Sequence, residues 1–303
     1  MKTGKQTLSR DEEELVVEVL RLRRWQLILN EELKVGTFEI PIHVAIGHEA
    51  LAVAVSNAMA GVDQLVPTHR NMAYNLLRAG NLRHIRDEYR LAPEGAAGGR
   101  LGSMNLTQPE RGVVYSSSIL GNNIAVACGL ALAKDVKRED GTVIVATGDG
   151  AMEEGPFYEG LVFARSHRLR VLIVVENNDH SMWSTIDERR CAIRLADMAH
   201  AVDVPFLQLS GNNPVDYASR VKATRDTVER SRSPALIEAL LAPINNHAGA
   251  TPGWPTDPRQ ISIENGLVVQ ESSHDPVFVL RESLGSDAFE DLAARSVGDD
   301  WEA

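Results

Sequence analysis

The sequence is poor in cysteine and has no long apolar run. Its 303 residues include two cysteines, Cys128 and Cys191, too few for a disulfide framework or a cysteine-based metal site. No segment approaches the roughly 18 consecutive apolar residues of a membrane-spanning helix. The basic residues near the N-terminus, Lys2 and Lys5, are not followed by the apolar stretch of a signal peptide. We therefore expect a cytoplasmic protein without a membrane partner.

Positive charge is also scarce. Lysine and arginine number 31 against 42 aspartates and glutamates, which gives a formal net charge of −11 at pH 7. Binding to a nucleic-acid backbone requires clustered basic residues, and no basic patch offsets the acidic excess. The sequence also lacks the Gly-x-Gly-x-x-Gly fingerprint of dinucleotide-binding Rossmann domains. We expect neither a nucleic-acid partner nor a plain dinucleotide-binding domain.

What is present is an alternation of strand and helix patterns. Apolar, β-branched runs alternate with helical patterns from about residue 45 to residue 242, which indicates an α/β fold with a doubly wound, mostly parallel sheet. Residues 1–40 are predicted to form an amphipathic helix used for packing or subunit contact. Residues 41–258 are predicted to form the α/β domain, with a late Pro/Gly-rich loop at 243–258 that is typical of an active-site lid. Residues 259–303 are predicted to be a helical extension with an acidic tail.

The most informative stretch begins at Gly148-Asp149-Gly150. A strand-like run precedes it at residues 141–147, and a second run at 171–175 leads into Asn177-Asn178. Strand, tight turn, helix and strand form a βαβ unit, whose parallel strands end at the edge where α/β folds bind ligands. Oxygen atoms of Asp149 and Asn178 would then meet beside a helix that opens at the glycine turn, as a Mg²⁺-bound diphosphate requires. The triplet alone favours the simpler interpretation that Asp149 caps the helix; the Asn-Asn pair favours the metal site.

Three further segments are candidates on local features. Arg70 follows a short strand, where it would bind a phosphate bidentately or form a surface ion pair. Residues 116–118, all serine, precede an Ala-rich helix and would either admit a flat ring or cap that helix. His43 and His48 flank a glycine turn, where a structural role is favoured over substrate contact.

These segments occur in the order of one known family. The Gly-Asp-Gly triplet followed by Asn-Asn resembles the thiamine diphosphate signature. Over about residues 10–285 the chain resembles the alpha subunit of the thiamine diphosphate-dependent 2-oxo acid dehydrogenases of the pyruvate, branched-chain and acetoin types. The other matching segments are Ile46-Gly47-His48-Glu49-Ala50, His69-Arg70, Gly102-Ser103-Met104, Ser118-Ile119-Leu120-Gly121 and His247.

The resemblance implies a role for each matching residue. Asp149 and Asn178 would bind Mg²⁺ through their side chains, and His180 through its backbone carbonyl. Ser118 would meet the aminopyrimidine ring through its backbone, and Leu120 would be the apolar wedge under the bent cofactor. The full cofactor-binding set implied is His69, Arg70, Ser118, Leu120, Gly148, Asp149, Gly150, Ala151, Asn178 and His247. His247 is also the implied catalytic residue, which assists reaction at the thiazolium carbon.

The resemblance further implies a half active site. The family decarboxylates a 2-oxo acid with an acidic glutamate supplied by a beta subunit, so an alpha2beta2 enzyme that is inactive without its partner is expected. Departures at Asn105, Asn122-Asn123 and Asn245-Asn246 fall around the expected substrate pocket. They leave open whether the acyl or aldehyde carbanion equivalent passes to a lipoyl-bearing acyltransferase or forms a carbon–carbon bond. The alternatives are a split transketolase-like two-carbon transferase subunit and a non-catalytic scaffold subunit.

Overall fold

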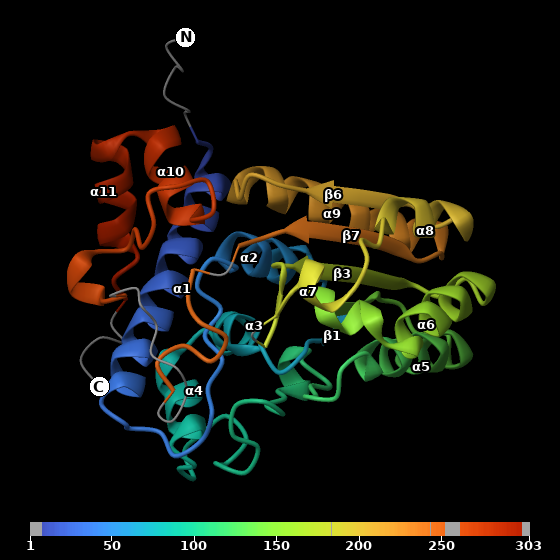
Figure 1. The fold of residues 1–303 in the computed structure, drawn as a ribbon, viewed down its shortest axis with the longest axis horizontal. Helices are drawn as coiled ribbons and strands as arrows, with labels where there is room; N and C mark the ends of the chain where they lie inside the picture. The colour runs from blue at the N-terminus through green and yellow to red at the C-terminus, as the bar shows by residue number, and fades with distance from the viewer. Residues whose placement is uncertain (1–7, 183, 243, 252–260, 299–303) are drawn as a thin grey trace.

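A five-stranded parallel sheet forms the centre of the structure (Figure 1). The structure, a computed structural model, describes residues 8–182, 184–242, 244–251 and 261–298. Half of the predicted late loop (residues 243 and 252–258) and the acidic residues at 299–302 lie outside these ranges. The strands are ordered β1-β2-β3-β7-β6 and all pairs are parallel. Their bounds are Gln64–Val66 (β1), Val143–Gly148 (β2), Val171–Asn177 (β3), Phe206–Leu209 (β6) and Ala235–Leu240 (β7).

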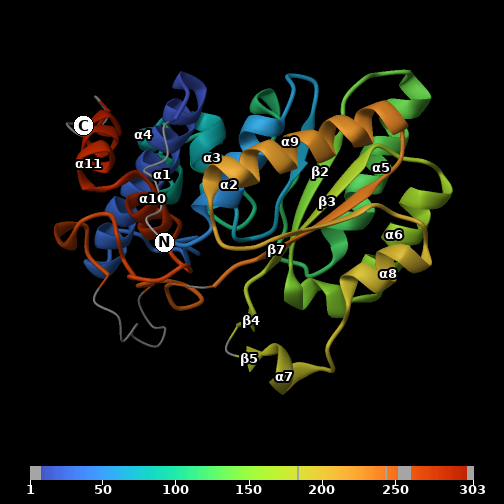
Figure 2. The same ribbon diagram turned by 90° about the horizontal axis from the view of Figure 1, so that it is seen from above.

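Helices cover both faces of this sheet (Figure 2). Side chains of successive strand residues point to opposite faces, and in β2 Ile144 and Ala146 enter one apolar core while Val143 and Val145 enter the other. The first core is covered by α2 (Glu49–Ala58), α3 (Met72–Ala79) and α9 (Pro214–Ser231), the second by α5 (Asn122–Lys137), α6 (Gly155–Ser166) and α8 (Leu195–Ala201). The predicted doubly wound α/β fold is confirmed.

The N-terminal helix packs as an integral part of the first core. α1 (Arg10–Lys34) begins with a capping box at Ser9 and buries an apolar face against α2, α9 and the C-terminal helices. Those are α10 (Pro276–Leu284) and α11 (Ser286–Arg295). Arg23 is fully buried and joins Glu49 at the start of α2 to Asp275 before α10, at 2.7 and 2.9 Å. α1 thus packs into the first core, whereas subunit contact and the domain limits at residues 40 and 258 stay predictions.

The remaining elements are short. α4 (Leu82–Tyr89), η1 (Pro109–Arg111) and η3 (Ile263–Asn265) are connecting turns and helices. Within the described ranges no helix combines the length and apolarity needed to cross a membrane. Cys128 is buried, Cys191 is exposed, and neither forms a disulfide, as the low cysteine content predicts.

The segment after β2 differs from the prediction. A helix was expected to open at the Gly148 turn, but residues Asp149–Glu153 form a 3₁₀ turn, η2, and α6 begins only at Gly155. Pro156 lies in the first turn of α6, where its missing N–H and fixed φ are tolerated. The tight turn therefore separates Asp149 from the helix.

A small hairpin projects from the carboxyl-end edge of the sheet (Figure 2). It follows β3 and consists of β4 (His180–Ser181) and β5 (Ser184–Thr185), paired antiparallel, with α7 (Ile186–Arg189) directly after them. The hairpin lies beside the η2 turn, so it closes one side of the edge at which the predicted site lies.

Candidate functional site at the carboxyl edge of the sheet

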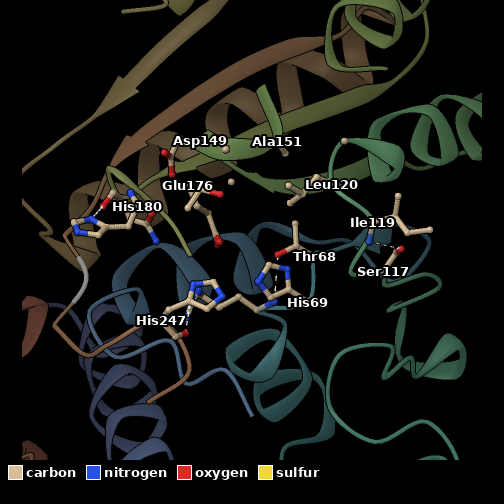
Figure 3. A pocket seen from close by; sticks show the side chains of 16 residues that line it. Thr68, His69, Ser117, Ile119, Leu120, Asp149, Ala151, Glu176, His180 and His247 are labelled. Carbon is tan, nitrogen blue, oxygen red and sulfur yellow. Dashed lines mark hydrogen bonds between the residues drawn. The ribbon is translucent and has the colours of Figure 1, made fainter. Parts of the chain in front are cut away.

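A cavity lies where the sequence places the site (Figure 3). It is bounded by the ends of β2 and β3, by the loops after β1 and before α5, and by the late loop. The lining residues are Thr68, His69, Arg70, Ser117, Ile119, Leu120, Gly121, Gly148, Asp149, Gly150, Ala151, Glu176, Asn178, His180, Ser181 and His247. This lining includes every residue of the predicted set except Ser118, which is exposed while its neighbours Ser117 and Ile119 face the cavity.

Asp149 is the most deeply buried acid of the cavity, with an exposed fraction of 1%. Its Oδ2 accepts a hydrogen bond of 2.7 Å from Arg189, and its buried Oδ1 has no partner among the described residues. Burial raises the pKa of this carboxyl group, and the charge and hydrogen bond of Arg189 oppose that effect. Its side chain does not cap α6, so the capping interpretation is wrong. An unpartnered carboxylate oxygen at a cavity is a position that an oxygen-seeking cation fits.

Gly150 is required by close packing in the turn. A Cβ atom at this position would lie 2.6 Å from Ser181 Oγ and 2.7 Å from Ser181 Cβ, distances that no side chain can occupy. The β4 strand is thereby held directly against the η2 turn, and Ala151 follows as a buried, cavity-lining residue. A glycine here lets the two predicted halves of the site meet.

Asn178 and His180 lie opposite Asp149 at the end of β3. The register pairs Gly148 with Glu176, so the residues that follow the two strands lie at the same level of the sheet. Asn178 is 8% exposed, and its Oδ1 accepts a hydrogen bond of 3.2 Å from the backbone N–H of His180. The expected convergence of the two strand ends is therefore present.

Arg70 joins two loops beneath the cavity. Its guanidinium donates to the carbonyl oxygen of Val44 at 2.7 Å and to that of His247 at 2.9 Å. Among the described residues it has no acidic partner within 4.0 Å, so the surface ion pair is the wrong alternative. Burial lowers the pKa of Arg70 to about 10, and the side chain remains charged at neutral pH. Its charge is available to an anion in the cavity.

Three imidazole rings meet at the floor of the cavity. The ring of His43 lies 4.8 Å from that of His69 and 5.0 Å from that of His247, edge to face in both cases. Burial, together with the charge of Arg70, lowers the pKa of His69 to about 4 and that of His247 to about 3. Both rings are therefore neutral at neutral pH. His43 packs against the two lining histidines, which sequence spacing could not have shown.

Glu176 is a cavity residue that sequence reasoning missed. Its Oε1 accepts a hydrogen bond of 2.6 Å from the Tyr74 hydroxyl, and its Oε2 lies 3.7 Å from Nδ1 of His48. Burial opposes its ionisation, but the interactions with His48 and Tyr74 outweigh burial and hold the pKa of Glu176 below its usual value. The signal in the sequence is an acid that ends an otherwise apolar strand, directly before Asn177.

A second cavity of about 240 Å³ adjoins the first. It is lined by Val44, Ile46, His48, Arg70, Asn178, His180, Met182, Asn245, Asn246 and His247. Of the departures from the family pattern, Asn245 and Asn246 are thus at a cavity. Asn123 instead donates to the Ala146 carbonyl at 2.7 Å inside the core, and Asn105 is exposed. Asn105 and Asn123 therefore line neither of the two cavities, and the expectation that the departures fall around the substrate pocket stays a prediction.

Comparison with known proteins agrees with the resemblance noted in the sequence. The sequence model described as "Dehydrogenase E1 component" matches residues 21–262. The alpha subunit of acetoin:2,6-dichlorophenolindophenol oxidoreductase of Bacillus subtilis is 27% identical over 74% of this chain and 67% of its own length. The alpha subunit of the pyruvate dehydrogenase E1 component of Rhizobium meliloti is 25% identical over 86% of this chain and 73% of its own length.

Other relatives cover the chain less evenly. The 2-oxoisovalerate dehydrogenase alpha subunit of Bacillus subtilis is 27% identical over 67% of this chain and 62% of its own length. A transketolase of Pichia stipitis has a similar fold, with a TM-score of 0.59 at 16% identity, over 94% of this chain and 45% of the transketolase. The chain therefore spans about half the length of that enzyme. Because the sequence relatives are alpha subunits, the dehydrogenase interpretation fits better than the split transketolase. The chain belongs to the dehydrogenase E1 component family.

Proposed function

We propose that the chain is the alpha subunit of a thiamine diphosphate- and Mg²⁺-dependent enzyme that decarboxylates a 2-oxo acid in the cytoplasm. The acyl or aldehyde equivalent then passes to a lipoyl-bearing acyltransferase or into a carbon–carbon bond. The observation that carries the proposal is the buried, unpartnered Oδ1 of Asp149, at a cavity that also contains Arg70, Asn178 and His247. These groups fit a metal-bound diphosphate.

The residues of the chain would bind and orient the cofactor. Asp149, Asn178 and the backbone of His180 would hold Mg²⁺, while Arg70, Gly150 and Ala151 would contact the diphosphate. When bound, thiamine diphosphate supplies the electron sink that decarboxylation needs. Leu120, an apolar side chain at the cavity, would support the ring system.

His247 is suited to a proton-transfer role at the substrate side. Arg70 Nη2 lies 3.4 Å from His247 Nδ1, and a guanidinium can only donate. This contact favours the tautomer in which Nδ1 accepts and the proton is on Nε2. With its pKa lowered to about 3, the ring can donate a hydrogen bond to a carbonyl or carboxylate without carrying a charge.

The acid that the aminopyrimidine needs would come from a beta subunit. The cavity has two carboxylates, and both are engaged: Asp149 with Arg189, and Glu176 with Tyr74. No further acidic side chain lines it within the described part of the chain. A partner that contributes a glutamate would complete the site, as in an alpha2beta2 enzyme.

An apolar face beside the cavity supports this partner. Half of the large, exposed apolar side chains of the described ranges lie on α5, on α6 or in the turn before α5: Ile119, Leu120, Leu132, Val136, Tyr158, Val162 and Phe163. A groove of about 310 Å³ runs between the two helices past Gly129. Because Ile119 and Leu120 also line the cavity, a subunit seated on this face would close the cavity as well. An exposed apolar surface of this kind marks an interface.

Filling the groove is expected to block the partner without harming the fold. A Cβ atom at Gly129 would meet nothing within 4 Å, and Gly129 lines the groove, so the tryptophan of Gly129→Trp is expected to place its ring in the groove. Gly129→Ala is the matched control, since it adds about 1 kcal/mol of helix propensity and little bulk. Analytical ultracentrifugation with the beta subunit should show association weakened at least about tenfold for the tryptophan variant only. Equal association of both variants would place the partner on another surface.

The function is tested by reconstitution. The full chain is produced alone and together with the protein encoded by the neighbouring gene, and carbon dioxide release is measured from pyruvate, branched-chain 2-oxo acids and acetoin-related substrates with thiamine diphosphate and Mg²⁺. Activity only for the pair supports the proposal. Decarboxylation by the chain alone would refute the half-site, and two-carbon transfer between sugar phosphates would support the transketolase alternative.

A further inference from the structure

Arg189 holds three acceptors with one guanidinium. It is the last residue of α7, and its side chain is 12% exposed. Nη2 donates to Asp149 Oδ2 at 2.7 Å, Nε donates to Glu153 Oε1 at 2.9 Å, and Nη1 donates to the backbone carbonyl of Ser184. A planar guanidinium can satisfy three such acceptors at once because its N–H groups point in fixed, diverging directions.

The contact divides the two oxygens of Asp149 between different environments. Oδ2 is occupied by Arg189, whereas Oδ1 is buried and has no partner within the described residues. A hydrogen bond to one oxygen restrains rotation of the carboxylate. The guanidinium therefore restrains the orientation of this cavity-lining side chain and leaves Oδ1 without a hydrogen-bond partner within the described residues.

The same contact joins the two halves of the site. Asp149 belongs to the turn after β2, while Arg189 ends α7, in the segment after β3 that also contains Asn178 and His180. This segment is ordered by its own bonds: Ile186 N–H donates to Asp179 Oδ1 at 3.0 Å, and Thr185 forms a capping box with Glu188. The ion pair between Arg189 and Asp149 joins this segment to the turn after β2.

We infer that Arg189 is a positioning residue for the metal site, which orients Asp149 by one oxygen and fixes the hairpin that carries the other ligands. The inference rests on the proposed function. An opposite role is conceivable on charge alone: a guanidinium near a carboxylate can act as a cation substitute that must leave before a metal binds. The geometry favours positioning because Arg189 occupies Oδ2 and leaves Oδ1 of this cavity-lining residue without a hydrogen-bond partner within the described residues. The two roles predict changes of opposite sign.

Metal affinity in Arg189 variants distinguishes the two roles. Mn²⁺ is the probe, titrated into the complex of the full chain with its beta subunit and thiamine diphosphate, and free Mn²⁺ is measured by electron paramagnetic resonance. Arg189→Gln should weaken Mn²⁺ binding about 10- to 100-fold, as is usual when a partner of a ligating side chain is lost. Arg189→Lys should recover part of this loss, since an ammonium reaches Asp149 but cannot satisfy three acceptors.

Matched controls separate positioning from a general loss of structure. Arg190→Gln removes a neighbouring ion pair, at 3.1 Å from Glu153, that does not involve Asp149, and should leave Mn²⁺ affinity within about twofold. In an Asp149→Asn background, Arg189→Gln should cause little further loss, because its effect acts through that carboxylate. Urea unfolding of each variant reports whether the fold is retained.

Each outcome has a definite meaning. Unchanged Mn²⁺ affinity in Arg189→Gln would overturn the positioning role, and tighter binding would establish the cation-substitute role instead. If the glutamine variant does not fold, the folded lysine variant decides, with a partial loss of affinity expected. Absence of Mn²⁺ binding by the wild-type complex would refute the proposed metal site itself, a result distinct from failure of the Arg189 inference.

Discussion

Replacing Asp149 with alanine is expected to abolish Mg²⁺-dependent binding of thiamine diphosphate. The substitution removes the only carboxylate oxygen at the cavity that is buried without a partner in the described part of the chain. Loss of a metal-binding side chain should weaken binding on the order of 100-fold or more, beyond the effect of losing an outer partner. Isothermal titration of thiamine diphosphate with and without Mg²⁺ into the alpha–beta complex measures the effect.

The fold should survive this substitution. Without Asp149, Arg189 still donates to Glu153 at 2.9 Å and to the Ser184 carbonyl, so no isolated buried charge is created. The thermal unfolding transition should therefore shift little. Asp187→Ala, at an exposed acid of the same hairpin segment, is the control and should bind the cofactor normally. Unchanged, Mg²⁺-dependent affinity in Asp149→Ala would remove Asp149 from the metal site.

Replacing Arg23 with methionine is expected to cost about 3–5 kcal/mol in the free energy of unfolding, the usual effect of breaking a buried ion pair. Arg23, Glu49 and Asp275 are each fully buried, and Arg23 bonds to both acids and to the Leu267 carbonyl. Methionine fills a similar volume but leaves two buried carboxylates without their cation. Urea unfolding at neutral pH measures the loss, which should exceed that of any surface substitution.

Two measurements check whether the loss in Arg23→Met comes from the ion pairs: a matched substitution of the neighbouring Arg24, and the pH dependence of the stability difference. Among the described residues Arg24 makes a single hydrogen bond, a long one of 3.4 Å to the Ala293 carbonyl, so Arg24→Met should cost less than about 1 kcal/mol. Burial opposes ionisation of Asp275, but Arg23 outweighs it and holds the pKa of Asp275 below its usual value. This stabilisation is present above the unfolded pKa and is lost as pH falls through the folded pKa. The difference between wild type and Arg23→Met should therefore shrink in acid; a difference independent of pH would argue for lost packing alone.

The buried ion pair also bears on the site. Glu49 accepts a hydrogen bond of 2.8 Å from the Gly47 N–H and thereby fixes the turn between Ile46 and His48. Both of those residues line the second cavity. The ion pairs of Arg23 with Glu49 and Asp275 are therefore linked, through the Gly47 turn, to the wall of the second cavity.

The elements and the position of the site could be predicted from the sequence. The strands β2 and β3 are continuous apolar runs, and a helix between them forces a parallel crossover. Once the crossover is parallel, both strand ends lie at one edge, so Asp149 and Asn178 must approach each other. These inferences need only local periodicity and the geometry of one connection, which the order of residues contains.

The pairing of side chains around the site was decided only by tertiary structure. Arg189 reaches Asp149 across 40 positions and Arg70 reaches His247 across 177, and no local pattern specifies such partners. The same holds for the loop before α5, because local sequence does not specify that Ser117 lines the cavity while Ser118 is exposed. Contacts of this kind depend on how rigid elements pack, because a small rotation of one loop exchanges neighbouring side chains. The sequence determined which chemistry meets at the sheet edge, and packing determined which oxygen of Asp149 is bound by Arg189 and which has no partner within the described residues.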